Sequence, residues 1–362
     1  MSISDSRSRA QGSASTPPAS VLSAFGFSQA SRAHPVAGGL INHTFQVVEG
    51  GRRVALQRLN PIFQPTVNLD IDAITTHLAH KGMLTPRLVP TNDGALWTVD
   101  LDGAAWRALS WLEGRTLHTV ERASTARAAG QLAARFHEAV SDLSHTFHFT
   151  RPLAHHTETH LARLRDALRE HVLHPNFEAV SRLGASILQQ AEQLPALPSL
   201  PTRLIHGDLK VSNVLFDDAE TTALALLDLD TMANLTIPIE LGDALRSWCN
   251  PAGEDEARAT LRADLFQAAL AGYADASPAF LTREESASIV LGTQTIALEL
   301  AARFCADALN ESYFGWNEKK FSSRSEHNRI RASSQLSVAE SIQSQRAELE
   351  RIVSTHFAVA SR

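Results

Sequence analysis

The sequence predicts an α+β protein in two lobes, with a small antiparallel sheet followed by a larger, mainly helical part. Residues 36–112 contain short alternating apolar runs separated by glycine-bearing turns, a pattern typical of consecutive antiparallel strands. From residue 124 onward, apolar residues recur at helical spacing. Two short apolar runs interrupt this helical part, and they lead to the carboxylates Asp208 and Asp228. These observations together predict a helical lobe with a functional hairpin inside it.

The bulk composition allows a sizeable core and excludes several classes of partner. The chain has 362 residues, of which 44% are hydrophobic and 20% charged, and its formal net charge is −6. A mildly acidic chain is a poor candidate for binding nucleic acid or a membrane surface. Cys249 and Cys305 are far apart and form neither a disulfide framework nor a zinc site. No apolar run reaches the roughly 18 residues of a transmembrane helix. We therefore expect a cytoplasmic protein, monomeric or weakly dimeric.

The first lobe is expected to follow a short tail. Residues 1–20 are rich in Ser, Ala, Pro and Arg, which favours a disordered N-terminal segment. Residues 21–114 are expected to form the first lobe, with five strands and one helix over 66–82. Gly38 and Gly39 form either a plain turn or a loop whose backbone N–H groups cover the phosphates of a nucleotide.

The second lobe is expected to span residues 115–362 and to surround the hairpin with helices. Histidines 155, 156 and 160 lack an accompanying carboxylate or cysteine pattern, so a solvated helix face is favoured there over a metal site. The helical spacing covers residues 124–141, 158–171, 176–193, 240–250, 254–275, 283–309 and 326–355.

The hairpin contains the residues best suited to catalysis. Asp208 follows an apolar run, Asn213 follows Asp208 after a short loop, and a second pair of apolar runs ends at Asp228. Magnesium prefers hard oxygen ligands, and an acceptor hydroxyl needs a carboxylate to orient it and take its proton. The hairpin therefore predicts magnesium-assisted phosphoryl transfer. The alternative is a solvated hairpin with ordinary turn residues, because Asp and Asn are common in turns.

The spacing His-x-Asp-x-x-x-x-Asn, followed by a strand that ends in Asp, resembles the catalytic and metal loops of protein-kinase-like enzymes. Gly207 and the Leu-Asp-Leu-Asp sequence at 227–230 resemble the aminoglycoside phosphotransferase branch. Residues 35–345 also resemble the N-acetylhexosamine 1-kinase group of that superfamily. The resemblance implies a protein-kinase-like two-lobed fold that uses ATP and Mg²⁺, with nucleotide bound by the first lobe. The similar segments begin at Gly39, Leu56, Arg87, Lys210, Asp228, Gly242, Glu254, Glu299 and Glu326.

The same resemblance implies roles for the residues of the hairpin. Asp208 resembles the residue that orients and deprotonates the acceptor hydroxyl, and Asn213 and Asp228 resemble the metal ligands. The implied supporting residues are His206, which fixes the loop, Asp243, which buttresses it, and Asp230, which assists the metal or only holds the loop.

The implied nucleotide site departs from the usual kinase pattern. Kinase-like enzymes place a Lys on the third strand, whereas Gln57 occupies that register here. Arg58 is the nearest cation, but alternation turns it to the opposite face unless a bulge re-aims it. The similar N-acetylhexosamine kinases also have Gln-Arg here, and the helical partner of the Lys corresponds to Asp70 or Asp72. The predicted nucleotide-binding residues are Gly39, Asn42, Thr44, Gln57, Arg58 and Glu113.

The acceptor side leaves three functions open. Arg303 either contacts a sugar, as the resemblance implies, or pairs with Glu299 one helical turn earlier. Tyr313 and Arg331 are expected on the same side. The first function is phosphorylation of a sugar, at the anomeric hydroxyl of an N-acetylhexosamine or a related molecule. The second uses a cationic acceptor (an amino alcohol, homoserine or an aminoglycoside), for which residues 254–256 offer an acidic pocket. The third is a non-catalytic nucleotide-binding module.

Overall fold

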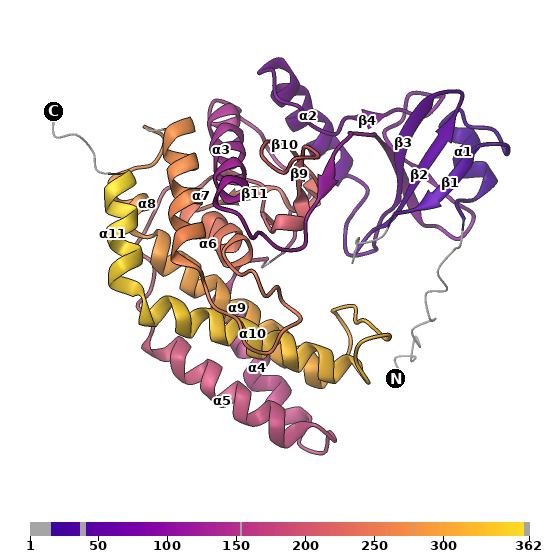
Figure 1. Cartoon of the computed structure of the whole chain (residues 1–362). Coiled ribbons are helices and arrows are strands. Elements are labelled where there is room, and N and C mark those ends of the chain that lie inside the picture. Colours follow the sequence, from indigo (N-terminus) through magenta and orange to yellow (C-terminus); the bar gives the residue numbers. More distant parts are fainter. Residues whose placement is uncertain (1–15, 37–40, 153, 278, 358–362) are drawn as a thin grey trace. The chain divides into compact units, whose positions relative to one another are not determined.

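The computed structural model describes the chain from residue 16 to residue 357, except for residues 37–40, 153 and 278 (Figure 1). The chain divides into two compact units. The first unit is an antiparallel sheet with a short helix, and the second is mainly helical. This confirms the predicted α+β class. The first unit comprises Met1–Pro61 and Leu88–Trp111, and the second comprises Ile62–Arg87 and Leu112–Arg362.

The first unit has its core on one face of a six-stranded sheet. Helix α1 (Ala19–Ala24) supplies Val21 and Leu22 to this core, where they meet alternate residues of the central strands such as Leu56 and Trp106. The residues between them in sequence therefore face the other side of the sheet. The strands are β1 (Arg32–Pro35), β2 (His43–Glu49), β3 (Arg52–Arg58), β4 (Leu88–Val89), β5 (Thr98–Val99) and β6 (Ala105–Ser110).

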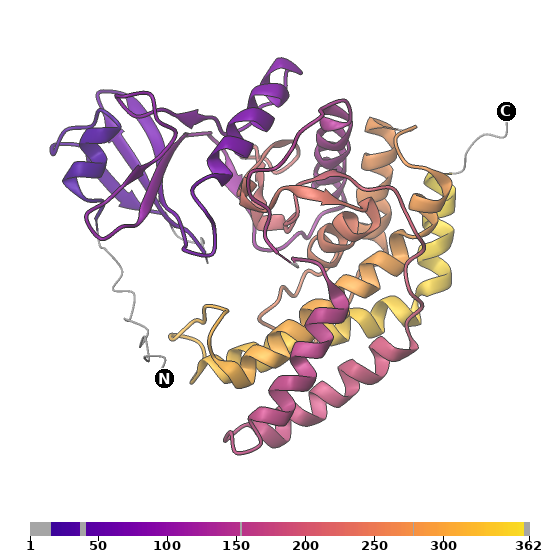
Figure 2. The same ribbon diagram turned by 180° about the vertical axis from the view of Figure 1, so that it is seen from behind.

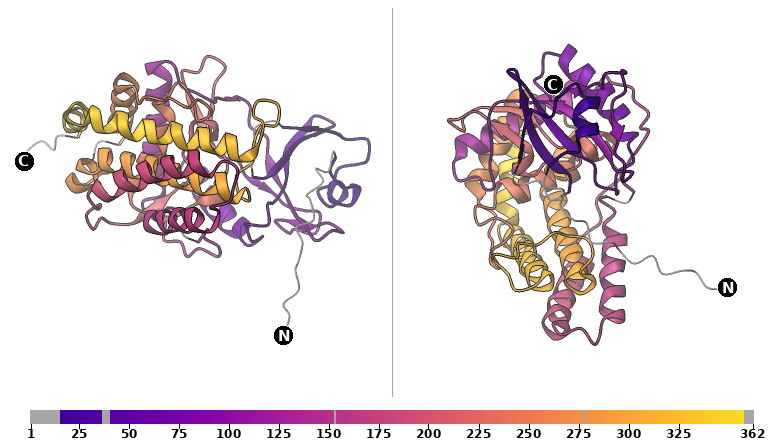
Figure 3. Two further views of the ribbon diagram at one scale, coloured as in Figure 1. Left: turned by 90° about the horizontal axis from the view of Figure 1, so that it is seen from below. Right: turned by 90° about the vertical axis from the view of Figure 1, so that its right-hand side faces the viewer.

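The second unit is built around a long apolar helix, α9 (Ile289–Asn310). In Figures 2 and 3, α9 lies within the helical unit and runs alongside other helices of that unit. By length and composition α9 is a candidate membrane span, but 83% of its most apolar window is buried, as in the core helix of a globular protein. The other helices are α2 (Val67–His80), α3 (Ala123–Val140), α4 (Thr157–Glu170), α5 (Phe177–Gln193), α6 (Ile237–Trp248), α7 (Ala263–Ala276), α8 (Arg283–Ala287), α10 (Arg324–Ser344) and α11 (Arg346–His356).

Three predicted helical segments differ from the observed ones. The helix expected over 254–275 begins only at Ala263, because the preceding acidic side chains are held by ion pairs in an irregular segment. The long patterns at 283–309 and 326–355 are each divided in two, at Ser288 and at Gln345. Apolar spacing continues across both junctions, which is why the sequence does not mark the breaks.

The predicted hairpin is present in the second unit. Strands β9 (Val214–Phe216) and β10 (Ala223–Leu226) are antiparallel, and β7 (Arg115–Thr116) pairs with β9. Strand β8 (Arg203–Ile205), just before the His206 loop, pairs instead with β11 (Ala233–Leu235). Such short strands leave the functional residues in the connecting loops, which contain the one-turn helices η1 (Val211–Asn213) and η2 (Leu229–Thr231).

Candidate active site

A buried glutamate of α6 supports the catalytic loop. Both carboxylate oxygens of Glu240 accept backbone hydrogen bonds, from His206 N at 2.8 Å and from Gly207 N at 3.0 Å. Burial opposes ionisation of Glu240, but its hydrogen bond with His137 and the nearby histidines hold its pKa below the usual range. The sequence assigns the buttressing role to Asp243, which instead accepts hydrogen bonds from Arg246 at 3.0 and 2.7 Å. The buttress is therefore Glu240, about one helical turn earlier.

His206 connects the two functional loops. Its Nδ1 accepts a hydrogen bond from Asp208 N at 3.3 Å, so Nε2 is the donor to Leu227 O at 2.8 Å. Thr231 Oγ1 donates to His206 O at 3.0 Å. Gly207 has φ +80°, and a Cβ there would lie 2.2 Å from Thr231 O. The close approach and the left-handed backbone both require glycine at this position.

Asp208, whose side chain is 20% exposed, contacts two polar side chains. Its Oδ2 accepts from Lys210 Nζ at 2.6 Å and from Asn213 Nδ2 at 3.0 Å. Burial raises the pKa of Asp208, but the Lys210 ammonium outweighs it and lowers this pKa to about 2. Burial lowers the pKa of Lys210, and the charges of Asp208 and Asp228 raise it overall. The site thus holds an ionised carboxylate beside a protonated amine at neutral pH.

The residues expected to hold a metal offer hard oxygen atoms. The amide nitrogen of Asn213 is directed at Asp208, so its carbonyl oxygen is the atom able to ligate a cation. Asp228 has φ 60° and ψ 62°, a left-handed conformation that Asp adopts more readily than most residues. Asp230 is buried in η2, immediately after Asp228. An amide oxygen and a carboxylate fit a divalent cation that prefers oxygen.

Two arginines, Arg303 and Arg151, lie against the rings of Phe314 and Tyr313, and the sequence indicates only Arg303 as a site residue. Arg303 of α9 is 15% exposed, and its guanidinium carbon lies 5.7 Å from the ring centroid of Phe314. Arg151 donates to the hydroxyl of Tyr313 and lies 5.3 Å from the centroid of that ring. Burial lowers the pKa of Arg151, and the charge of Arg303 lowers it further, whereas Asp208 raises it. Arg151 and Arg303 thus lie against the rings of two adjacent residues, Tyr313 and Phe314. No motif marked Arg151, because it precedes α4 in an irregular segment.

Glu299, the alternative partner of Arg303, is engaged mainly by other residues. Its Oε1 lies 3.9 Å from Arg303 Nη1 but 3.4 Å from His155 Nδ1, and its Oε2 accepts from Thr157 Oγ1 at 2.7 Å. His155 Nε2 lies 3.1 Å from Gly207 O. His155 and His160 are thus largely buried against Glu299 and not on the solvated helix face that the sequence predicted.

The acidic residues 254–256, which the sequence offers as a pocket for a cationic acceptor, are paired with cations of the protein. Each of these side chains is engaged by one or more cationic groups of the protein itself. The protein cations offset the carboxylate charge that would attract a cationic ligand. The pairs are Glu254 with Arg246, Asp255 with both His327 (2.7 Å) and Arg331 (3.1 Å), and Glu256 with Lys320 (3.2 Å).

Arg331, predicted as a substrate-binding residue, is engaged by the protein. Its Nε donates to Asp255 and its Nη1 donates to Gly315 O at 2.9 Å. Its guanidinium carbon also lies 5.6 Å from the ring centroid of Phe304. Through these contacts, Arg331 links α10 to the irregular segments that contain Asp255 and Gly315.

In the first unit, a row of polar side chains crosses the sheet face opposite the core. Thr44, Gln57 and Arg107 are cross-strand neighbours on β2, β3 and β6. Gln57 Nε2 donates to Thr44 Oγ1 at 3.0 Å, and Gln57 Oε1 accepts from Arg107 Nε at 2.9 Å and Nη2 at 2.7 Å. Arg107 is the cation beside the register that Lys occupies in kinases. The feature of the sequence that could have identified Arg107 is its charge within the apolar run 104–112.

Of the other predicted nucleotide-binding residues, those that the structure describes are not members of this row. Arg58 is on the opposite sheet face, where its charge lowers the pKa of Asp100, so alternation prevails and no bulge re-aims it. Asn42 is buried and accepts from Asn60 N at 2.9 Å. Gly39 lies outside the described residues. Glu113 is exposed in the second unit.

Comparisons with known proteins are consistent with this geometry. The family described as "Phosphotransferase enzyme family" matches residues 32–278. A homoserine kinase of Sinorhizobium fredii is 28% identical over 179 residues, which are 48% of this chain and 50% of that protein. The chain therefore matches about half the length of that relative.

Solved structures share the fold at low sequence identity. A microcompartment-associated aminopropanol kinase superposes with a TM-score of 0.60 and 16% identity, covering 90% of this chain and 96% of the other. An amicoumacin kinase in complex with AMP-PNP and Ca²⁺ gives a TM-score of 0.56 at 16% identity, covering 83% and 87% of the two chains. These likenesses concern the fold alone.

Proposed function

Because the chain belongs to the phosphotransferase enzyme family, we propose that it transfers a phosphoryl group from ATP to a hydroxyl of a neutral sugar. Kinases of this family use ATP with a divalent metal ion, in agreement with the cofactors expected from the sequence. The acceptor we favour is an N-acetylhexosamine or a related sugar, at its anomeric hydroxyl.

One observation supports this acceptor class above the others. The acids at 254–256 are paired with protein cations, while Arg151 and Arg303 lie against the adjacent rings of Tyr313 and Phe314. Two guanidinium groups repel a simple cationic amino alcohol. They donate well to hydroxyl and amide oxygens, because Arg has five N–H donors in a rigid arrangement. Tyr313 and Phe314, packed edge to face at 4.7 Å, add an aromatic wall suited to a sugar ring.

The loop of the second unit supplies the chemistry. The ionised Asp208 orients the acceptor hydroxyl and takes its proton. Lys210 holds this carboxylate in place and adds positive charge close to the phosphoryl group in transfer. Asn213 and Asp228 would hold the metal ion, which offsets the charge of the phosphates when bound.

The first unit provides a cation for the nucleotide in spite of the missing Lys. We assign this role to Arg107. In the polar row of the sheet, Arg107 donates to the side chain of Gln57, which in turn donates to Thr44. Arg107 is only 1% exposed and donates two N–H groups to Gln57, so we propose that it acts on the α- and β-phosphates through its positive charge.

A second candidate acceptor is homoserine. Homoserine is an amino alcohol with a carboxylate, and that carboxylate would be attracted by Arg151 and Arg303 where choline-like molecules are repelled. The relative that is 28% identical is a homoserine kinase, which favours this candidate over other amino alcohols.

A panel of acceptors read by phosphorus NMR distinguishes the candidates. The panel contains N-acetylhexosamines, their unacetylated parents, homoserine and an aminopropanol, each with ATP and Mg²⁺. We expect phosphorylation of an N-acetylhexosamine, with the new phosphorus coupled to the anomeric proton. Phosphorylation of homoserine alone would replace the sugar proposal with the second candidate. ATP turnover that no acceptor stimulates would contradict both.

The remaining expectations concern location and assembly. We propose a cytoplasmic enzyme, where ATP is available and cysteines stay reduced. Cys249 and Cys305 are both free and buried, which suits such a compartment. We also propose a monomer or weak homodimer, which sedimentation at several protein concentrations would test.

A further inference from the structure

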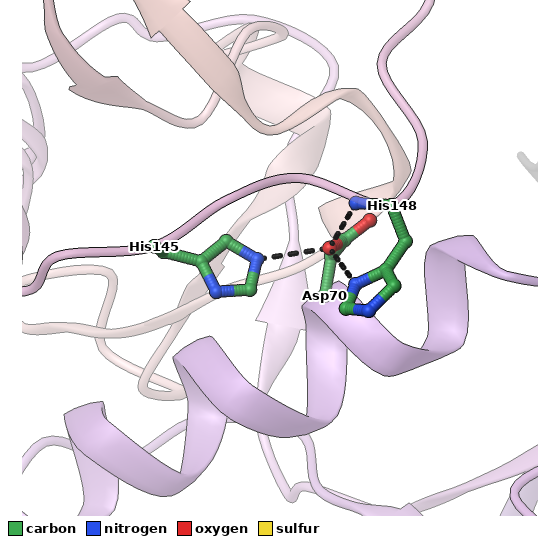
Figure 4. Close-up of side chains that lie close together, drawn as sticks. All are labelled: Asp70, His145 and His148. Atoms are coloured by element: carbon green, nitrogen blue, oxygen red, sulfur yellow. Dashed lines mark hydrogen bonds and ion pairs between the residues drawn. The ribbon is translucent and has the colours of Figure 1, made fainter.

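A compact group of one carboxylate and two imidazoles lies in the second unit, formed by residues outside the catalytic loop (Figure 4). Asp70 comes from α2, and His145 and His148 come from the segment that follows α3. Asp70 Oδ1 accepts from His145 Nε2 at 2.8 Å and from His148 Nδ1 at 3.0 Å. One ligand atom from each of the three residues lies within 4.8 Å of the others.

We propose that Asp70, His145 and His148 bind a divalent transition-metal ion of the zinc class. Zinc binds imidazole nitrogen at about 2.0–2.1 Å and carboxylate oxygen at about 2.0–2.2 Å. Two ligands on one such ion are therefore separated by roughly 3 Å, close to the two oxygen–nitrogen distances here. An ion can therefore replace the protons of the two imidazole–carboxylate hydrogen bonds, and the oxygen–nitrogen distances need to increase only slightly.

Backbone contacts hold the carboxylate in place independently of the imidazoles. Asp70 Oδ1 accepts from His148 N at 2.9 Å, and Oδ2 accepts from Phe149 N at 3.0 Å. These bonds join helix α2 to the 145–149 segment and orient the carboxylate toward both rings. Carboxylate ligands of metals are typically supported by such outer hydrogen bonds.

Charge and exposure also suit an ion. The side chain of Asp70 is 2% exposed and that of His145 is 9% exposed, so the carboxylate charge is almost entirely removed from water. A divalent cation held beside this carboxylate would offset its buried charge. The side chain of His148 is 51% exposed, which leaves a path for the ion and room for water ligands.

This site differs in kind from the one proposed at Asn213 and Asp228. Two imidazole nitrogens favour zinc, nickel or copper over magnesium, which prefers oxygen. A large excess of Mg²⁺ should therefore leave the site at Asp70, His145 and His148 available for Zn²⁺. Binding there would tie α2 more firmly to the 145–149 segment.

The test is calorimetric titration of the full metal-free chain with Zn²⁺, in excess Mg²⁺ and without nucleotide. We expect one saturable site, weakened about ten-fold or more in His145→Ala and in His148→Ala. The matched control is His77→Ala. His77 is also on α2 and contacts Asp142 and Ala139 O, outside the group. Because the chain has 16 histidines, the comparison with His77→Ala separates this site from weak binding elsewhere.

A second measurement does not depend on the variants folding. Cobalt added to the wild-type chain should give visible absorption bands of a site with nitrogen ligands, and Zn²⁺ should abolish them. The proposal is overturned if no saturable Zn²⁺ binding or no cobalt band is found, or if His145→Ala and His148→Ala both bind as the wild type does. Neither result bears on phosphoryl transfer, because these residues are outside the catalytic loop.

Discussion

At the scale of single residues, Asp208 has the role that is most sharply testable. Asp208→Asn should lower turnover by about 10²–10⁴-fold, because an amide cannot accept the hydroxyl proton. ATP binding should persist, since the substitution keeps the shape of the side chain. Turnover and nucleotide affinity, measured on the same preparation, check this. A variant that retains nearly full activity would remove Asp208 from the role of base.

Arg303 and Arg151 separate the acceptor site from a merely structural cluster. Either one, replaced by Ala, should lower kcat/KM for the acceptor by roughly 1–3 kcal/mol of lost charged hydrogen bonding. The KM for ATP should stay the same. Steady-state kinetics for each substrate, beside a melting curve, are the measurement. If the only role of Arg303 were to pair with Glu299, the variant would have a lower melting temperature and the kinetics for both substrates would change together.

Arg107 is tested against a neighbour on the other face of the same sheet. Arg107→Met should raise the KM for ATP about ten-fold or more through the loss of a positive charge beside the phosphates, with little change in the KM for the acceptor. Arg58→Met is the matched control, because Arg58 lies on the opposite face, near Asp100. Equal effects of the two substitutions on the KM for ATP would point to a general loss of sheet stability.

At the scale of elements, the catalytic loop depends on how closely α6 and α9 pack. A Cβ added at Gly242 would lie 2.6 Å from Gly292 O, so Gly242→Ala should push the helices apart and displace Glu240 from the loop. We expect a loss of about 1–3 kcal/mol of stability, together with lower kcat. Gly184→Ala is the control, because its Cβ meets the flexible end of Leu168 at 3.0 Å. Denaturant unfolding and kcat for both variants test this, and equal behaviour would contradict it.

The elements also mark the limit of what the sequence predicted. Helices and strands with regular apolar spacing were predicted well, because their burial repeats along the chain. Glu240 and Asp243 are acidic residues about one turn apart on α6, and only the packing of that helix decides which one faces the loop. The sequence did not indicate Arg107, because cross-strand pairing places it beside Gln57. It did not indicate Arg151, because that residue lies in an irregular segment and contacts the distant Tyr313.

At the scale of the whole molecule, several carboxylates with lowered pKa values predict sensitivity to acid. Asp208 and Asp255 both have a pKa of about 2, through Lys210 for the first and through His327 and Arg331 for the second. A lowered folded-state pKa adds stability above the unfolded value of about 4, and that stability is lost as the pH falls toward 2.

Thermal unfolding between pH 7 and pH 2 should therefore show a steep loss of stability below about pH 4. Asp255→Asn should be less stable at neutral pH and should lose less on acidification, because it has no charge to neutralise. A wild-type melting temperature that stays constant down to pH 3 would contradict this account.

If Arg151 and Tyr313 bind the acceptor as proposed, their placement has a consequence for how substrate preference can change over evolution. Arg151 and Tyr313 belong to segments outside the helices, whereas the transfer loop is held by the buried Glu240 and by His206. Substitutions in those segments leave the buried support of the loop intact. A lineage can therefore exchange one phosphate acceptor for another without rebuilding its transfer machinery, and a laboratory library confined to the segments around 151 and 313 is the economical route to new specificities.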